Sequence, residues 1–278
     1  MAFFSATMFT VATDRTVLEE RQQQRNKTMN ETMKIKDPDL AFLAKCTDGE
    51  LDPMIEVLQG KDRRGRISSE LEYEPRYQLY YPQHSMYVDL IAHEFQKYGG
   101  NTFCNIFRGG GVSYKEILCN VCGKMKVNYN PESSVERIEG GLLAKVLEEV
   151  WEKMSDDEKR ETLEAAGCNP HAMGGMTTSM MIALFRHGGF KSYIIVLKVV
   201  NYVWRAIFGK GLSLVANKTI CKALAVLSGP VGWTVSGVWT AIDISSPALR
   251  VTIPGVIYIA ALRHMKNEEA ALAAQKAA

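Results

Sequence analysis

Two pairs of residues have types and spacing that could hold a metal ion. Cys119 and Cys122 form a CxxC pair, and His93-Glu94 begins like the HExxH helix of zinc proteases. A zinc site needs four ligands, and no second pair with matching spacing accompanies the cysteines. Lys97 stands where HExxH would require its second histidine. We therefore expect no metal and no cofactor, and we interpret both pairs as ordinary helix residues.

A glycine-rich loop is the second candidate for chemistry. Three glycines follow an arginine and lead to Ser113, a residue type that caps helices, so backbone amides and a positive helix end could face an anion. The loop lacks the GxxxxGK[ST] order of a phosphate-binding loop. Our first interpretation is a tight turn that needs positive φ. The residues that we keep as anion- or lipid-binding candidates are Arg108, Gly109, Gly110 and Gly111.

The elements that would position these residues are helices. A Ser or Thr followed three residues later by Glu can form a capping box at a helix N-terminus. This pattern occurs at Thr47/Glu50, Ser113/Glu116, Ser133/Glu136 and Ser155/Glu158. Asp37-Pro38 predicts one more start, with Asp as the cap and Pro at the first helical position.

Apolar residues recur with a period of 3.6 over 87–98, 117–125 and 135–154, which indicates amphipathic helices. No run alternates with period two for long enough to predict a strand. We therefore predict an all-α fold, in which an N-terminal helical hairpin and a helical module precede an apolar, Gly-rich C-terminal helical region.

Composition excludes several classes of protein. The chain has 278 residues, 46% of them hydrophobic and 23% charged, which argues against wholesale disorder, collagen-like repeats and a polytopic transporter. Six cysteines in a chain of this length are not a disulfide framework. The charge is divided unevenly, because residues 1–170 hold 22 Lys/Arg against 28 Asp/Glu, whereas residues 171–278 hold 11 against 3. An acidic half is thus joined to a basic one.

The basic half contains a long apolar helix pattern and an uncharged run. Residues 190–208 are apolar around most of a helical circumference, and Lys191, Lys198 and Arg205 recur on them every seven residues as one polar stripe. Residues 223–242 carry no charge and are as long as a bilayer-spanning helix, but their Gly, Pro and Ser content makes their hydrophobicity modest.

A third apolar piece, residues 251–262, is too short to span a bilayer. Three surroundings could absorb this half: the core of a helical domain, a membrane, or nucleic acid. Nucleic acid fits poorly, because the cations are sparse and interleaved with aliphatic residues. In a membrane, the cationic stripe would meet headgroups. Three glycines would then allow close helix packing in the soluble or the lipid-bound form: Gly229, Gly232 and Gly237.

The chain divides by composition into seven segments. The first, 1–35, is interpreted as a disordered tail or as a start assigned too early, with Met29 and Met33 as alternative starts. The others are a helical hairpin at 36–60, an aromatic and charged linker-like segment at 61–83, an acidic helical module at 84–168, a linker at 169–187, a basic apolar helical domain at 188–266 and a tail at 267–278. With no export signal and free thiols, we expect the cytoplasm.

The sequence resembles the YaaW-like family of bacterial proteins. The likeness runs in order over about 36–266 and is carried by 37–58, 98–102, 108–115, 228–232 and 250–263. Members of this family are also labelled as relatives of a ubiquinol–cytochrome c chaperone, so the resemblance implies an assembly role near a membrane complex. It implies no catalytic residues.

We therefore expect a non-enzymatic protein with a soluble interaction module and a C-terminal region that faces or enters a membrane, peripheral at the inner membrane. The alternative is a soluble assembly chaperone or adaptor for a protein partner such as a respiratory subunit, bound through an exposed apolar surface. Oligomerisation is compatible with both hypotheses. An enzyme would require the Arg108 loop to converge with His93 or Glu94 in one pocket.

Overall fold

The computed structural model describes residues 34–60, 70–99, 112–169, 177–209, 211–212 and 247–277. Every regular element in these ranges is a helix, which confirms the predicted all-α class. The α-helices are α2 (Asp48–Leu58), α3 (Pro75–Tyr80), α4 (Val88–Gly99), α6 (Tyr114–Lys124), α7 (Val135–Lys153), α8 (Asp156–Ala165), α9 (Thr178–His187), α10 (Gly189–Phe208) and α13 (Pro247–Ala277). The described ranges also hold the short 3-10 helices η1 (Ala41–Lys45), η2 (Leu71–Tyr73) and η3 (His84–Tyr87).

Side-chain caps fix most of the helix starts where the sequence predicts them. Complete capping boxes form at Thr47 and Ser155, and the Ser113 hydroxyl accepts from the backbone of the third helical residue. The predicted cap at Ser133 is wrong, because Ser134 accepts from Arg137 N instead. The reason is a preceding turn, in which Ser133 N donates to the carbonyl of Asn130, 3.0 Å away, so that extended backbone begins only at the next residue.

The Asp37 carboxylate accepts hydrogen bonds from its own turn and from two other helices. The predicted α-helix at Asp37-Pro38 is a turn that leads into η1, with Asp39 N donating to Asp37 Oδ1 at 2.9 Å. Asp37 Oδ2 also accepts from Tyr114 N at 2.7 Å and from Gln96 Nε2 at 2.8 Å. One carboxylate therefore joins the N-terminal turn to α4 and to the first residue of α6.

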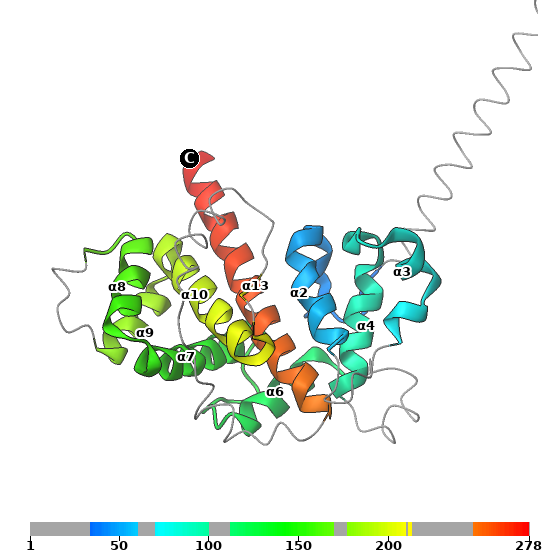
Figure 1. Ribbon diagram of the computed structural model, residues 1–278, viewed down its shortest axis with the longest axis horizontal. Coiled ribbons are helices and arrows are strands. Elements are labelled where there is room, and N and C mark those ends of the chain that lie inside the picture. Colours follow the sequence, from blue (N-terminus) through cyan, green and yellow to red (C-terminus); the bar gives the residue numbers. More distant parts are fainter. Residues whose placement is uncertain are drawn as a thin grey trace, which may run out of the picture.

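Helix α13 runs through the middle of the molecule (Figure 1) and packs against α2, α4, α6, α7 and α10. Its residues 251–263 are all buried, as expected of a helix that is apolar all round and surrounded by others. Gly255 permits the closest approach, since a Cβ there would lie 2.3 Å from Phe95 Cε2. The twelve-residue apolar piece of the sequence is thus part of a helix of 31 residues, which continues through the segment assigned to a tail.

Buried side chains from both halves of the sequence form one hydrophobic core. Within the described ranges, no helix is long and apolar enough to cross a membrane. Several predictions lie outside those ranges, so the structure does not describe the residues they concern. These are the Arg108–Gly111 loop, the uncharged run 223–242 and the three packing glycines at 229, 232 and 237.

Candidate functional site

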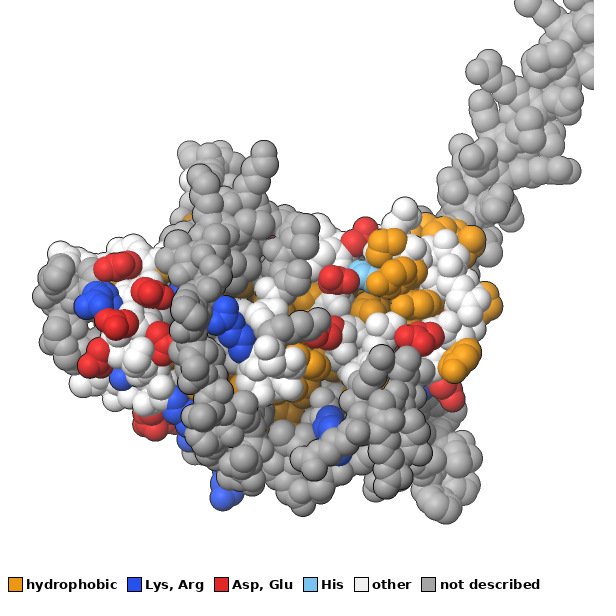
Figure 2. Space-filling model, in the orientation of Figure 1, with side chains coloured by type: hydrophobic (Ala, Val, Ile, Leu, Met, Phe, Trp, Pro, Cys, Tyr) orange, Lys and Arg blue, Asp and Glu red, His pale blue; other side chains and the backbone are white. Residues whose placement is uncertain are grey.

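One short segment holds most of the apolar side chains that the fold leaves exposed. Among the described residues, the exposed large hydrophobic side chains are Tyr73 (80%), Leu79 (72%), Tyr81 (56%) and Met180 (49%). The first three lie within η2, α3 and the residue after α3, and we call them the α3 surface. In Figure 2, hydrophobic side chains gather on the side of the molecule that α3 forms, with Asp and Glu side chains around them.

The segment that carries the α3 surface is fixed at several points. Leu71 of η2 is buried, although α3 itself buries no residue. Arg76 of α3 makes a bidentate ion pair with Asp89 of α4, at 2.9 and 2.5 Å. Gln59, at the end of α2, donates to the Tyr77 hydroxyl at 2.6 Å. The exposed side chains are therefore presented by backbone that is tied to α2 and α4.

Aromatic rings connect this surface to the interior. Tyr77 lies between Tyr81 and Tyr87, with ring centroids 5.3 Å from each, and His84 packs at 5.8 Å from Tyr81 and 5.7 Å from Tyr87. Tyr87 is fully buried, whereas Tyr81 is mostly exposed. Ring pairs of this geometry stabilise one another beyond simple burial. The outer ring thus rests on an ordered stack.

Two carboxylates of α2 hold the inner end of the stack. Asp52 Oδ1 lies 2.9 Å from His84 Nε2, and the other ring nitrogen of His84 lies 2.5 Å from the Tyr87 hydroxyl. Ser85 N donates to Asp48 Oδ1 at 2.7 Å. Burial acts to raise the pKa of Asp48, but the hydrogen bonds from Ser85 and the nearby His84 lower it overall. Negative charge is therefore favoured beside these rings.

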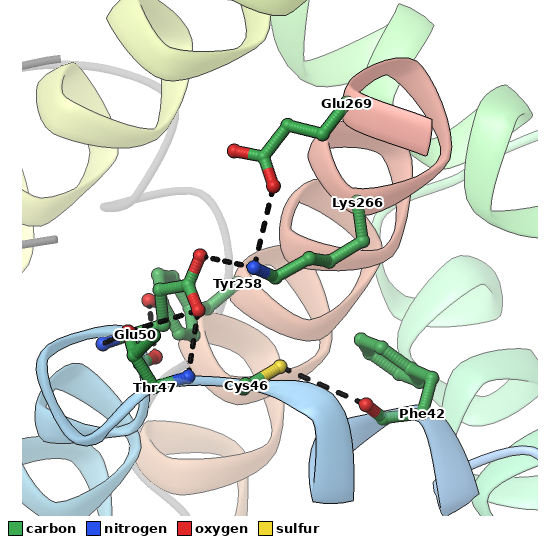
Figure 3. A network of polar contacts seen from close by, with 7 residues as sticks. All are labelled: Phe42, Cys46, Thr47, Glu50, Tyr258, Lys266 and Glu269. Carbon is green, nitrogen blue, oxygen red and sulfur yellow. Dashed lines mark hydrogen bonds and ion pairs between the residues drawn. The ribbon is translucent and has the colours of Figure 1, made fainter. Parts of the chain in front are cut away.

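A second polar cluster lies on α13 and serves to hold the fold (Figure 3). Lys266 Nζ lies 2.6 Å from Glu50 Oε1 and 3.3 Å from Glu269 Oε2. Glu50 in turn accepts from Thr47 N at 2.7 Å, and its backbone carbonyl accepts from the Tyr258 hydroxyl at 2.7 Å. These contacts fasten the N-terminal hairpin to α13. Nearby, burial raises the pKa of Cys46 to about 12, which disfavours its thiolate form.

A buried ion pair fastens α13 to α7. Arg263 Nε donates to Glu139 Oε2 at 2.8 Å, and the Tyr114 hydroxyl donates to Glu139 Oε1 at 2.6 Å. The Arg263 guanidinium also stacks on Phe42, 4.3 Å from the ring centroid. Burial raises the pKa of Glu139 to about 7, against the opposing effects of Arg263 and Tyr114.

One cluster has the residue types of a hydrolase triad but the wrong hydrogen bonds. Ser192 Oγ lies 2.7 Å from His264 Nε2, and Glu268 lies 3.9 Å from the same nitrogen. Ser192 donates its proton to the carbonyl of Phe185, 2.8 Å away, so it has none to give to His264. His264 must then donate to the serine. This serine is buried and is not an activated nucleophile.

The three residues of the predicted cationic stripe on α10 differ in how far they are buried. Lys191 is exposed, Arg205 is partly buried and Lys198 is only 5% exposed. Desolvation lowers the pKa of Lys198 to about 8, against the nearby carboxylates of α8. The predicted contact of these three residues with lipid headgroups stays a prediction.

The metal-like pairs of the sequence are helix residues. Cys119 is partly buried and Cys122 is buried, and burial raises the pKa of Cys122 to about 12. The Glu94 carboxylate accepts from Glu70 N and pairs with Lys97 at 3.0 Å. In the part of the chain that the structure describes, no three His, Cys, Asp or Glu side chains gather as a metal ion would require.

The sequence analysis missed the α3 surface as a site. Its signal was present, since four tyrosines fall within nine residues at helical spacing, at positions 73, 77, 80 and 81. We interpreted that segment as linker-like because it is charged and aromatic and separates the N-terminal hairpin from the next helices.

The chain is similar to known proteins over most of its length. A family model described as ubiquinol–cytochrome C chaperone matches residues 83–258. A UPF0174 protein of Helicobacter pylori strain J99 is 42% identical over 241 residues, which cover 84% of this chain and 93% of that protein. A second one from the same strain is 39% identical, over 73% of this chain and all of the relative.

The UPF0174 protein YaaW of Escherichia coli K12 is 30% identical over 239 residues, which cover 83% of this chain and 95% of YaaW. No solved structure gives a significant match. The predicted resemblance to YaaW-like proteins is thus confirmed, and the α3 surface lies just before the part that the family model matches.

Proposed function

This chain belongs to the UPF0174 (YaaW-like) family and to the ubiquinol–cytochrome C chaperone family, and from that premise we propose that it is a chaperone that holds a polypeptide partner on the α3 surface. The partner is an apolar subunit of a membrane complex, held before assembly. In this proposal the protein acts without catalysis, in the cytoplasm at the inner membrane.

The exposed α3 surface is the observation that supports this function. Binding energy at protein interfaces is concentrated in a few side chains, with aromatic residues prominent among them. Burying a fully exposed leucine is worth about 1.5–3 kcal/mol, and Leu79 is 72% exposed. Tyrosine loses little conformational entropy on binding and can pair its hydroxyl. A fixed surface with two tyrosines and a leucine suits the capture of an apolar segment.

Aggregation of a client tests the proposal. An apolar membrane subunit of a ubiquinol–cytochrome c complex is diluted out of detergent, and light scattering is followed with and without the full chain. We expect the wild type to suppress scattering and Tyr73→Ser/Leu79→Ser to lose most of that effect. Tyr81 is left intact because its ring packs on Tyr77.

Met180→Ser is the matched control, because Met180 is also exposed but lies on α9. It is expected to behave as the wild type. Equal suppression by the wild type and the Tyr73→Ser/Leu79→Ser variant would contradict the proposal.

Contact with an anionic membrane is the second candidate function. It is favoured by the charge of residues 171–278, with 11 Lys/Arg against 3 Asp/Glu, and by the exposed Lys191 on α10. Flotation of the full chain with phosphatidylglycerol vesicles tests it. Co-flotation that falls as salt rises would support the membrane contact, and its absence at low salt would remove it.

A further inference from the structure

The charges around the α3 surface indicate which kind of segment fits it. Two cations that the structure describes on this side are already paired, since Arg76 binds Asp89 in a bidentate manner and Lys97 lies 3.2 Å from Glu70 and 3.0 Å from Glu94. Within the described ranges, the charged side chains left beside the exposed rings are carboxylates.

Two of the remaining carboxylates belong to the segment itself. Glu72 and Glu74 flank Tyr73 and are partly exposed, and within the described residues neither carboxylate makes an ion pair or a hydrogen bond. Glu72 is close enough to Tyr77 to contribute, after burial, to the raised pKa of that phenol. Both carboxylates are therefore available to a partner.

A third carboxylate comes from α2. Asp52 contacts His84 at 2.9 Å, yet half of its side chain is exposed. Asp52 beside His84 and Glu72 near Tyr77 therefore bring negative charge to the aromatic stack. The exposed faces of tyrosine rings also attract cations.

Resting on the proposed function, we propose that the α3 surface binds a polypeptide segment in which Lys or Arg residues alternate with apolar ones. Leu79 and the tyrosines take the apolar side chains, and Glu72, Glu74 and Asp52 take the cations. An anionic membrane is disfavoured at this surface because the same carboxylates repel its headgroups.

Binding of matched synthetic peptides to the full chain tests this inference. Three fluorescent peptides share the same leucines and carry Lys, Gln or Glu at the intervening positions. We expect the Lys peptide to bind the wild type most tightly and the Glu peptide most weakly. We expect Glu72→Gln/Glu74→Gln to lower the affinity for the Lys peptide by about 2- to 30-fold. This is the range expected from the loss of two exposed ion pairs.

The matched control is Glu152→Gln/Glu164→Gln, which removes the same net charge from exposed positions on α7 and α8. It should leave the affinity for the Lys peptide unchanged. The difference between the two variants should shrink at high salt.

The outcomes separate this inference from the proposed function. If the three peptides bind equally and Leu79→Ser weakens all of them, the charge preference is wrong while the binding surface stands. If no peptide binds, or Leu79→Ser changes nothing, the surface itself is wrong. Flotation with anionic vesicles that Leu79→Ser abolishes would assign the surface to lipid and overturn the inference.

The chain carries cations of its own just before this segment. A preference for the Lys peptide that appears only after Arg63, Arg64 and Arg66 are changed to Gln would also contradict the inference, because the surface would then select cations of this chain.

Discussion

The buried stretch of α13 and the α3 surface are two apolar regions that differ in their exposure to solvent. Residues 251–263 of α13 are covered on every side by helices from both halves of the sequence. Helix α3 buries no residue, and the segment around it leaves Tyr73, Leu79 and Tyr81 in contact with solvent.

The difference lies in what the polar groups do. On α13, Arg263 forms an ion pair with Glu139 and Lys266 forms one with Glu50. Both pairs hold neighbouring helices together. Around α3, Glu72 and Glu74 remain available. The apolar residues of α13 therefore support the fold because other helices cover them, whereas those of the α3 surface are exposed and have carboxylates beside them that are available to a partner.

Breaking the α13–α7 ion pair should have the largest effect on stability. Arg263→Leu leaves the carboxylate of Glu139, which is 2% exposed, with the Tyr114 hydroxyl as its remaining partner. Removing one member of a buried ion pair costs about 3–5 kcal/mol. Urea unfolding at pH 8 measures the change.

The double variant Arg263→Leu/Glu139→Leu is the control for that prediction. It should recover part of the loss, because an apolar pair of similar volume removes the uncompensated charge, while the buried Tyr114 hydroxyl loses its acceptor. A change below about 1 kcal/mol in the single variant would mean that the pair is not buried as described.

Truncation of one leucine in each region separates their roles directly. Leu262 of α13 is fully buried, so Leu262→Ala should lower the free energy of unfolding by about 2–5 kcal/mol. Leu79 is 72% exposed, so Leu79→Ala should change the free energy of unfolding by no more than about 0.5 kcal/mol. Equal losses in the two variants would contradict the distinction between the regions.

The free energy of unfolding should decrease as the pH rises through the range in which Glu139 titrates. The folded-state pKa is raised from 4.5 to about 7, so between these values the folded state holds a proton that the unfolded state has lost. The free energy of unfolding therefore decreases as pH rises through this window, by at most about 1.4 kcal/mol per pH unit.

Glu139→Gln should flatten this dependence. Unfolding of both proteins at pH 5 and pH 7.5 is the measurement. A wild-type stability that rises relative to the variant over this interval would show that the carboxylate is stabilised in its charged form.

The smallest expected effect concerns the start of α7. Ser134→Ala removes the side-chain cap and should cost about 1 kcal/mol, whereas Ser133→Ala, one residue earlier, should be close to neutral. Thermal unfolding of the two variants decides between the observed cap and the one that the sequence pattern indicated.

Much of the fold could be predicted because local signals determine it. The capping boxes at Thr47 and Ser155 and the 3.6-residue period of residues 135–154 each involve neighbours in sequence. The family could also be identified, because its motifs recur in order along the chain. The central position of α13 could not be predicted, since the pairing of Arg263 with Glu139 joins residues 124 positions apart.

The candidate site was missed for a different physical reason. Patterns of burial predict cores, and an exposed apolar surface has no such pattern. Tyr73, Tyr77 and Tyr81 are spaced four apart, yet contacts with Gln59 and Tyr87, which are distant in sequence, leave Tyr77 partly covered while the other two are exposed.

Amide hydrogen exchange of the full chain with its bound client tests the central claim most directly. The client is the apolar membrane subunit captured on dilution from detergent, and the free chain is the reference. The account predicts slower exchange in residues 70–87, in η2, α3 and η3, with little change in α13. Unchanged exchange in those residues, with protection appearing on α9 or α10 instead, would contradict it.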